Sequence, residues 1–381
     1  MKIAFYAPMK HPDSPVPSGD REMARNLIRA LERRHSVTVA SRFCSRDGKG
    51  EPARQQRLAT LGEKCAERLI RRWTAAAEAP DAWFTYHVYH KAPDRLGPSV
   101  CKAFDIPYFM AEVSHAPKQA GGRWDIGYSA AEAAIRAADG IIGLSSLDAA
   151  CVLPLLADPG RYHRLAPFTD TAPLAAAARN RTQHRAEICR RFAIDADVPI
   201  LLAVGMMRDG DKLASYRVLA KALAGIADSN WTLLVVGDGP ARGEVEGAFS
   251  SLTPGRVFFA GSAARDELPA FYAATDLLVW PAVNEAYGMA LLEAQATGLP
   301  VVAGRTGGVP DVVRDGRTGV LCTVGDTAVF ADTVADLLQK PSQLDAMRVS
   351  ALSMTAAEND IAAAADRLDE ILQTTRKARA A

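Results

Sequence analysis

The sequence has few cysteines, and no two of them lie close together in the chain. The six cysteines are scattered and form no C-x-x-C pair, which argues against a structural zinc site. Unpaired thiols are typical of a reducing compartment, so we expect a cytoplasmic protein without disulfides. The six residues are Cys44, Cys65, Cys101, Cys151, Cys189 and Cys322.

Long apolar runs and low-complexity segments are also missing. No stretch approaches the roughly 20 apolar residues that a membrane-spanning helix needs. Met1 leads directly into the strand-like segment KIAFYAP, so we expect no signal peptide. The chain has 381 residues, 49% of them hydrophobic and 23% charged. This length and composition are typical of a globular protein with about two domains.

The net charge is only +1, but it is unevenly distributed. Residues 1–170 carry a net charge of +5 and the remainder carries −4. A basic N-terminal half suggests an anionic partner such as a lipid surface or an acidic glycan, but an ordinary well-solvated surface explains it somewhat better. We expect no nucleic-acid partner.

Residues 53–73 place apolar side chains at helical spacing among arginines and lysine. Leu58, Leu61, Cys65, Leu69 and Trp73 form the apolar stripe. Such a helix either lies on an anionic membrane or packs its stripe on a sheet with its basic groups in water. The sequence leaves both interpretations open.

Short apolar strands alternate with helical patterns along the whole chain, which is the signature of parallel α/β sheets. In the first half we predict strands at 3–7, 37–41, 83–87, 108–112, 140–144 and 163–167. In the second half we predict them at 200–205, 232–237, 257–261, 277–281, 300–304 and 319–323. Their brevity and continuous apolarity suit strands covered by helices on both faces. The predicted fold class is therefore α/β, with two doubly wound domains.

Composition also suggests where the domains end. Residues 167–185 contain two prolines, polar residues and an alanine run, which favours an interdomain linker. We therefore expect an N-terminal domain at 1–168, a linker at 169–185 and a C-terminal domain at 186–354. The Ala-rich tail at 355–381 is predicted to be helical.

The most informative motif is NEAYGMALLEAQATGLP, at residues 284–300. Two carboxylates, Glu285 and Glu293, stand eight residues apart, and the turn Tyr287-Gly288-Met289 between them opens an apolar helix that Gly298 ends. Gly288 lets a ligand approach the backbone, and the free N–H groups of the first helical turn form an anion site. Glu293 then lies roughly 7 Å further along the helix axis.

This spacing suits a nucleotide diphosphate-sugar. Sugar hydroxyls would bind Glu285, phosphates would bind at the helix start, and ribose hydroxyls would bind Glu293. The alternative is an ordinary helix with one solvated glutamate on its face and another in the preceding loop. The two carboxylates alone do not decide between these interpretations.

The wider context resembles the family 4 glycosyltransferases of the GT-B fold. That family carries E-x7-E, then a G-x-P-V-V strand and a G-G-x-P-E turn. Here the corresponding residues are Glu285 to Glu293, GLPVVAG at 298–304 and GGVPD at 307–311, with Asp311 where the family usually has Glu. Arg208 and Lys212 stand where the family has an Arg and a Lys. The resemblance covers most of residues 198–340 and is much weaker over 1–170.

The resemblance implies a retaining transfer of a sugar from a nucleotide diphosphate-sugar, with no metal and no cofactor. Arg208, Lys212 and the helix start at 287–289 would stabilise the departing diphosphate, Glu285 would orient the sugar, and Glu293 would hold the ribose. Strand ends at Gly205 and Gly261 and the turn at Gly19 would also face the donor. In the resembled fold the final helix crosses back onto the N-terminal domain.

Candidates in the N-terminal half follow two predicted strands. The family usually has a histidine just past the strand at Tyr108, and both Glu112 and His115 are candidates for lining the reaction site. His87, Tyr89 and Lys91 cluster at another strand end and are candidate acceptor contacts. His87 and His90 have H-x-x-H spacing, but alternation on a strand sends them to opposite faces, so we expect no metal site there.

Several questions stay open at the level of the sequence. The sugar, the base (UDP or GDP) and the acceptor, whether a glycan, a lipid or a small molecule, cannot be read from it. A nucleotide-sugar epimerase or hydrolase, or a non-catalytic nucleotide-sugar-binding protein, are the alternatives. We expect a cytoplasmic enzyme of polysaccharide or glycolipid synthesis, with possible contact to the inner face of the membrane through its basic N-terminal half.

Overall fold

The computed structural model describes residues 1–16 and 18–380, and the chain divides into two compact units. Unit 1 combines Met1–Phe168 with the chain from Ile361 onward, and unit 2 is Thr169–Asp360. Each unit is built on one six-stranded sheet in which the paired strands are parallel. The predicted α/β class with two doubly wound domains is therefore confirmed.

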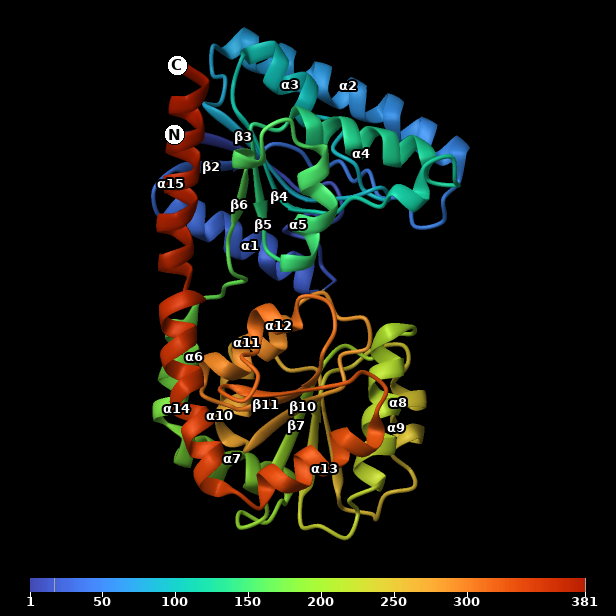
Figure 1. The fold of residues 1–381 in the computed structure, drawn as a ribbon, viewed down its shortest axis with the longest axis vertical. Helices are drawn as coiled ribbons and strands as arrows, with labels where there is room; N and C mark the ends of the chain where they lie inside the picture. The colour runs from blue at the N-terminus through green and yellow to red at the C-terminus, as the bar shows by residue number, and fades with distance from the viewer. Residues whose placement is uncertain (17, 381) are drawn as a thin grey trace. The chain divides into compact units, whose positions relative to one another are not determined.

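Unit 1 has the strand order β2-β1-β3-β4-β5-β6 (Figure 1). The strands are β1 Lys2–Tyr6, β2 Ser36–Val39, β3 Ala82–Val88, β4 Tyr108–Val113, β5 Gly140–Gly143 and β6 Tyr162–Arg164. The α-helices are α1 Gly19–Glu32, α2 Pro52–Ala76, α3 Gly97–Phe104, α4 Asp125–Ala137, α5 Ser146–Val152 and α15 Ile361–Ala380. Short 3₁₀ turns lie at Pro117–Gln119, Leu153–Leu155 and Pro159–Arg161.

The sheet of unit 1 is covered on both faces, as continuous apolar strands require. Helices α2, α3 and α4 pack against one another on one side, while α1 and α15 pack together on the other (Figure 1). Large side chains of the strands, such as Trp83, Phe84 and Phe109, are fully buried between these layers. Each of the six predicted strands overlaps an observed one.

Helix α2 contains the apolar stripe of residues 53–73, and it uses that stripe inside unit 1. Ala66 and Leu69 are buried in the core, and Cys65 and Trp73 pack against it. Leu61 is the exception, since about half of its surface is exposed. Most of the apolar stripe therefore packs into the core of unit 1. Basic side chains of α2, such as Arg57, Lys64 and Arg68, are exposed to solvent.

Unit 2 has the strand order β12-β11-β10-β7-β8-β9 (Figure 1). The strands are β7 Ile200–Val204, β8 Thr232–Val236, β9 Val257–Gly261, β10 Leu277–Trp280, β11 Val301–Gly304 and β12 Gly319–Cys322. The helices are α6 Thr171–Arg179, α7 Arg181–Phe192, α8 Asp211–Ala224, α9 Arg242–Ala248, α10 Leu268–Ala274, α11 Met289–Ala296, α12 Val309–Val312, α13 Thr327–Leu338 and α14 Pro341–Glu358. Helices α6, α7, α10, α11 and α14 form one layer, and α8, α9 and α13 form the other.

The segment at 169–185, expected as a linker, is instead helix α6 and the start of α7, and it belongs to unit 2. Two arginines of α7 explain the difference. Arg181 donates to Asp276 Oδ1 at 2.6 Å, and Arg185 donates to Asp276 Oδ2 at 2.8 Å. Asp276 also accepts the backbone N–H of Ile200 at 2.8 Å, so one carboxylate ties α7 to the start of β7.

The C-terminal tail also differs from the expected boundary at residue 355. Helix α14 continues to Glu358 in unit 2, and α15 begins at Ile361 in unit 1. Helix α15 buries Leu368, Ile371 and Leu372 and packs against α1. The helical prediction for this tail holds, but the unit boundary lies about one and a half turns further along the chain.

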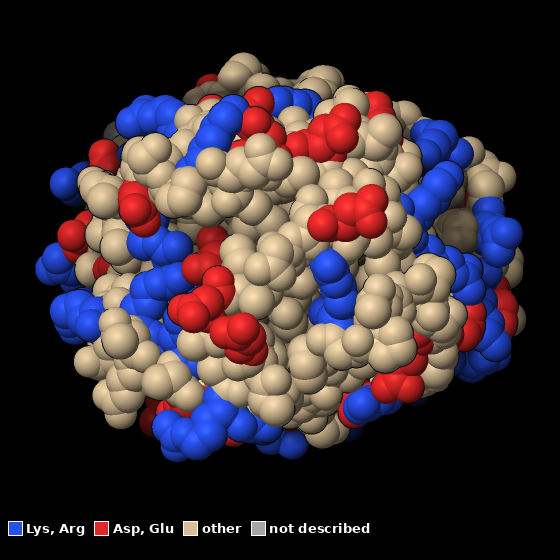
Figure 2. All heavy atoms as spheres, turned by 90° about the horizontal axis from the view of Figure 1, so that it is seen from below, with Lys and Arg blue, Asp and Glu red and all other residues tan. Residues whose placement is uncertain are grey.

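Among the described helices, none is both long and apolar enough to cross a membrane. Charged groups are mixed on the face shown in Figure 2, where lysine and arginine side chains lie in groups separated by acidic and uncharged residues. That face therefore presents a mixed charge pattern.

Replacing Asp276 by alanine is expected to loosen unit 2. The change leaves Arg181 and Arg185 half-buried without their carboxylate and should cost about 3 kcal/mol. Hydrogen exchange of the amides in β7 and β10, followed by mass spectrometry, should accelerate about a hundredfold. Asp228→Ala, at an exposed position of the same unit, is the control. Equal exchange in both variants would contradict the assigned role of Asp276.

Candidate functional site

The carboxyl ends of three strands of unit 2 approach one another backbone to backbone. A side chain at Gly237 would lie 1.9 Å from the carbonyl oxygen of Gly205, and the Gly237 N–H donates to the Gly261 carbonyl at 2.8 Å. The ends of β7, β8 and β9 are therefore close-packed at this edge. Ligands of doubly wound sheets bind at the carboxyl edge, so these ends mark the candidate site of unit 2.

The loop after β10 holds an unusual backbone conformation. Ala282 and Asn284 have positive φ angles of 56° and 52°, and Gly288 has φ 75° as the cap of α11. Positive φ is uncommon for residues other than glycine and is often retained at functional sites. At Gly288 a side chain would also come within 2.8 Å of Leu291. The loop therefore presents the first turn of α11 without a side chain in front of it.

Glu285 lies in this loop and is held by two donors. Lys212 Nζ donates to Glu285 Oε2 at 2.6 Å, and Trp280 Nε1 donates to the same oxygen at 3.0 Å. Lys212 Nζ also lies 5.1 Å from the centre of the Trp280 ring. Side-chain exposures of 27% for Lys212 and 16% for Glu285 leave both groups partly accessible. The structure thus brings these two predicted residues together.

Arg208 and the first residue of α8, Asp211, precede Lys212 in the sequence. Arg208 is exposed in the loop between β7 and α8, four residues before Lys212. Tyr216 of α8 supports the loop by donating to the Gly205 carbonyl at 2.7 Å, and its ring packs edge-on against Trp280 at 5.0 Å. The buried aromatic pair therefore supports Lys212, whose Nζ lies over the Trp280 ring.

The G-G-x-P-D turn packs directly on the Glu285 loop. A side chain at Gly307 would lie 1.9 Å from the carbonyl oxygen of Glu285, and the Gly308 N–H donates to the Ala286 carbonyl. Only glycine at 307 permits this contact, because any Cβ there would collide with the Glu285 backbone, and the positive φ of 52° adds to the preference for glycine. Asp311 follows in the short helix α12 and is partly exposed.

Glu293 lies in the middle of α11 and accepts a hydrogen bond from Tyr272 Oη at 2.9 Å. Burial and the Glu293 carboxylate raise the pKa of the Tyr272 hydroxyl well above its ordinary value, so the hydroxyl remains a donor. Both residues line a cavity of about 580 Å³ within unit 2. Its walls come from α6, α10 and the loop before α10, and they include Leu174, Leu268 and Arg265.

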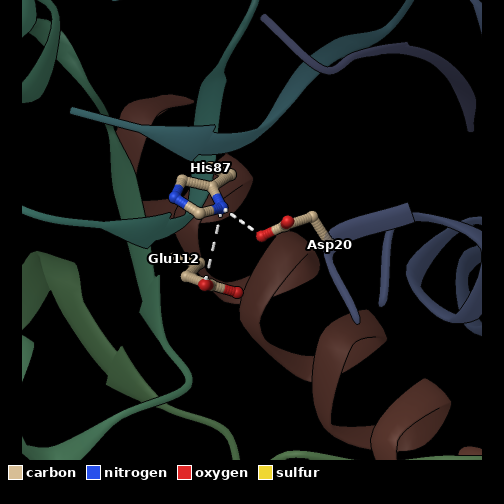
Figure 3. A group of neighbouring side chains, drawn as sticks. All are labelled: Asp20, His87 and Glu112. Atoms are coloured by element: carbon tan, nitrogen blue, oxygen red, sulfur yellow. Dashed lines mark ion pairs between the residues drawn. The ribbon is translucent and has the colours of Figure 1, made fainter. Parts of the chain in front are cut away.

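A second polar group lies at the carboxyl edge of the unit 1 sheet (Figure 3). His87 Nδ1 is 3.2 Å from Asp20 Oδ1 and 3.6 Å from Glu112 Oε1. Tyr86 Oη donates to the other oxygen of Glu112 at 3.0 Å. His87 is on β3, Glu112 is on β4, and Asp20 is in the first turn of α1, so three elements meet here.

The charges of His87 and of the two carboxylates stabilise one another. Burial opposes the charged imidazole, but the carboxylates of Glu112 and Asp20 outweigh it and raise the pKa of His87 to about 9. For Asp20, burial opposes ionisation, but the close, positively charged imidazole of His87 outweighs burial and lowers the pKa of the Asp20 carboxyl. His87 is therefore an imidazolium at neutral pH.

The two N-terminal candidates near the end of β4, Glu112 in the strand and His115 just after it, have different surroundings. Glu112 faces His87 and Asp20, whereas His115 is turned onto α4, where its Nε2 lies 3.1 Å from Tyr128 Oη and 3.2 Å from Glu132 Oε2. The His115 side chain is only 6% exposed. His115 therefore holds β4 and α4 together and does not point to the sheet edge. Glu112 lies at the sheet edge, beside His87.

The remaining N-terminal candidates are partly separated. Tyr89 stays beside His87, with ring centres 5.3 Å apart, but Lys91 lies over Trp124 at 4.7 Å. Gly19 begins α1, and Ser18 before it caps the helix by accepting the Arg21 N–H at 3.2 Å.

Three residues of these sites were missed in the sequence. Asp20, Trp280 and Tyr272 are not among the candidates that the sequence analysis identifies. Asp20 directly follows Gly19 at a helix start, which is a signal that could have found it. Trp280 and Tyr272 become visible only when β10 and α10 are folded beside Glu285 and Glu293.

Comparison with known proteins identifies the family. Residues 198–340 match the family model described as glycosyl transferases group 1. A D-inositol 3-phosphate glycosyltransferase of Salinispora arenicola is 32% identical over 275 residues, which are 67% of this chain and 59% of that protein. An N-acetyl-alpha-D-glucosaminyl L-malate synthase of Bacillus anthracis is 34% identical over 155 residues, covering 40% of this chain and 39% of the relative.

The chain belongs to the family 4 glycosyltransferases. The matched part of the chain spans 59% of the length of the Salinispora relative. Among solved structures, the Anabaena protein HepE in complex with UDP and glucose is similar, with a TM-score of 0.71 and 16% identity over 98% of this chain and 99% of that chain. The fold is GT-B, with two Rossmann-like units, as the resemblance implied.

The pKa of His87 gives a prediction about pH. The pKa of His87 is about 9 in the folded chain and 6.5 for an ordinary histidine. The ion pairs of charged His87 therefore stabilise the fold fully below pH 6.5, and this stabilisation is lost as the pH rises through about 9. An NMR titration of the His87 ring proton, assigned with His87→Gln, should give a midpoint near 9. His163 is an internal comparison, because burial and Arg367 lower its pKa below 6.5. A His87 midpoint near 6.5 would contradict the arrangement.

Proposed function

We propose that this protein is a retaining glycosyltransferase that moves a sugar from a nucleotide diphosphate-sugar to a hydroxyl group of an acceptor. The observation that carries the proposal is the pair of Glu285 and Lys212 at the carboxyl edge of unit 2, with Glu285 directly before the start of α11. A carboxylate suits sugar hydroxyls, and a cation with free helical N–H groups suits a diphosphate.

The diphosphate is the group that gains negative charge when the anomeric bond breaks. Lys212, Arg208 and the N-terminus of α11 would stabilise that charge, since ammonium, guanidinium and helix N–H groups all favour anions. Lys212 is paired with Glu285 at 2.6 Å, and this contact holds its charge at the carboxyl edge of the sheet. These groups would do the work that a divalent ion does at other sugar diphosphate sites, so we propose transfer without a metal.

The donor's other parts would bind on either side of the diphosphate. Glu285 would accept hydrogen bonds from the sugar hydroxyls, while Glu293 would accept them from the ribose. The cavity of about 580 Å³ beside Glu293 offers apolar walls for the nucleoside end and polar groups, including Arg265 and Asp266, at its border. These walls favour a nucleoside but do not select between UDP and GDP.

In the reaction itself the bond between the anomeric carbon and the phosphate oxygen breaks, and a bond to the acceptor oxygen forms on the same face of the sugar. The acceptor's proton passes to the leaving phosphate, so no protein nucleophile is required. Glu285 would offset positive charge that develops on the sugar ring. The departing diphosphate takes the electron pair of the broken bond and remains bound by Lys212 and Arg208.

On the acceptor side we propose Glu112, His87 and Tyr89 as polar contacts at the edge of unit 1, with Lys91 further out and His115 in a supporting role. The relatives are named for inositol phosphate and malate, both hydroxyl acceptors, and a glycan or lipid-linked hydroxyl is equally compatible with these groups. The basic surface of α2 favours an anionic acceptor or a membrane surface. A cytoplasmic location at the inner face of the membrane is part of this proposal.

Replacing Lys212 by alanine is expected to reduce the rate of sugar transfer by about a hundredfold or more, close to 3 kcal/mol of transition-state stabilisation. The reason is that the leaving diphosphate loses one of the two cations proposed to bind it. The purified protein is incubated with UDP- and GDP-sugars and candidate acceptors without metal, and the glycosylated product and the free nucleoside diphosphate are both quantified.

The control is Lys221→Ala, which removes an exposed lysine from the last turn of the same helix. Both variants are compared with the unchanged protein by thermal denaturation without ligand, so that a folding defect is recognised. Equal transfer by Lys212→Ala and Lys221→Ala would overturn the role of Lys212. Release of nucleoside diphosphate or epimerised sugar, with no product from any acceptor, would favour a hydrolase or epimerase.

A further inference from the structure

Asp20, His87 and Glu112 form a compact group of three metal-ligand side chains in unit 1 (Figure 3). One ligand atom from each residue lies within 4.8 Å of the other two. The three atoms are a ring nitrogen and two carboxylate oxygens, which is a donor set that zinc accepts. Each residue is partly exposed, so an ion could reach the group from solvent.

The spacing of the group agrees with the size of a zinc site. In a tetrahedral site with bonds of 2.0–2.2 Å, neighbouring ligand atoms are about 3.4 Å apart. The two distances from His87 Nδ1, 3.2 Å to Asp20 Oδ1 and 3.6 Å to Glu112 Oε1, bracket that value. Three protein ligands leave a fourth position for water or another small ligand.

The backbone holds two of the three side chains in place. His87 and Glu112 both have positive φ angles, 61° and 54°, although neither is glycine. Such conformations cost free energy and persist where the surrounding structure imposes them. They occur on adjacent strands, β3 and β4, at the point where the two side chains turn toward Asp20.

The hydrogen bonding of His87 is incomplete. Its Nδ1 is buried and has no hydrogen-bond partner of normal geometry among the described residues, although two carboxylate oxygens stand close to it. A buried polar atom without such a partner is costly, and an ion between the three groups would satisfy it. The two carboxylates also supply the negative charge that a divalent cation requires.

We propose that Asp20, His87 and Glu112 bind one divalent transition-metal cation of the zinc class. The cation binds the neutral imidazole, so the proton on Nδ1 leaves as the metal–nitrogen bond forms. It joins α1, β3 and β4 through one ligand each. The site lies wholly in unit 1, apart from the cations proposed to bind the diphosphate in unit 2. It shares His87 and Glu112 with the proposed acceptor contacts, so its test measures metal binding and not sugar transfer.

Cobalt(II) is the probe, because its absorption spectrum distinguishes nitrogen and oxygen ligands from thiolates. The full-length protein, stripped of metal with a chelator, is titrated with Co²⁺, and Zn²⁺ is then added to displace it. We expect one equivalent of Co²⁺ to bind with visible ligand-field bands, no thiolate charge-transfer band, and full displacement by Zn²⁺.

Asp20→Asn and His87→Gln should each weaken Co²⁺ binding by about a hundredfold or more. His90→Gln is the matched control, since His90 lies three residues from His87 but packs on Trp124, and it should bind like the unchanged protein. Circular dichroism and thermal denaturation of each variant establish that it is folded, and Asp20→Asn serves if His87→Gln does not fold.

Three outcomes would overturn the proposal. The first is the absence of ligand-field bands at one equivalent of Co²⁺. The second is a thiolate band, which would assign the metal to the cysteines. The third is unchanged binding in folded Asp20→Asn. None of these readouts depends on sugar transfer, so the proposed enzyme activity can fail or succeed separately.

Discussion

The ion pair between Lys212 and Glu285 is the interaction on which the candidate donor site depends. Lys212 lies in the first turn of α8, after β7, and Glu285 lies in the loop after β10. Strands β7 and β10 are neighbours in the sheet, and the two charges meet at 2.6 Å. Trp280 donates to the same carboxylate and lies under the lysine, so the pair is held on an aromatic floor. A partly exposed pair adds little stability, which indicates that its value lies in positioning two opposite charges for a ligand.

The glycines at the strand ends make that positioning possible. Gly237 and Gly307 each bring backbone against backbone at distances that a side chain would prevent. The space saved there lets the loops after β7, β8, β10 and β11 gather at one edge. At the carboxyl edge of unit 1 the side chains are positioned by the backbone of residues other than glycine. Positive φ angles at His87 and Glu112 turn their charged side chains toward the start of α1.

Much of this arrangement could be predicted from the sequence, because it depends on local pattern. Continuous apolar runs located all twelve strands, and the spacing of Glu285 and Glu293 around a glycine turn located α11. Long-range pairing could not be predicted. The prolines and alanines at 169–185 suggested a linker, but Arg181 and Arg185 find Asp276 some ninety residues away and make the segment part of unit 2. In the same way, only the folded chain brings Asp20 to His87.

The central claim is that Lys212 serves the diphosphate and Glu285 serves the sugar, and calorimetric titration with UDP and UDP-glucose, or GDP and GDP-mannose, tests it most directly. The account predicts that Lys212→Ala weakens binding of the free nucleotide and of the nucleotide sugar alike. It predicts that Glu285→Gln keeps affinity for the free nucleotide and loses only the additional affinity that the sugar contributes. Equal losses for both ligands in both variants would contradict the division of roles.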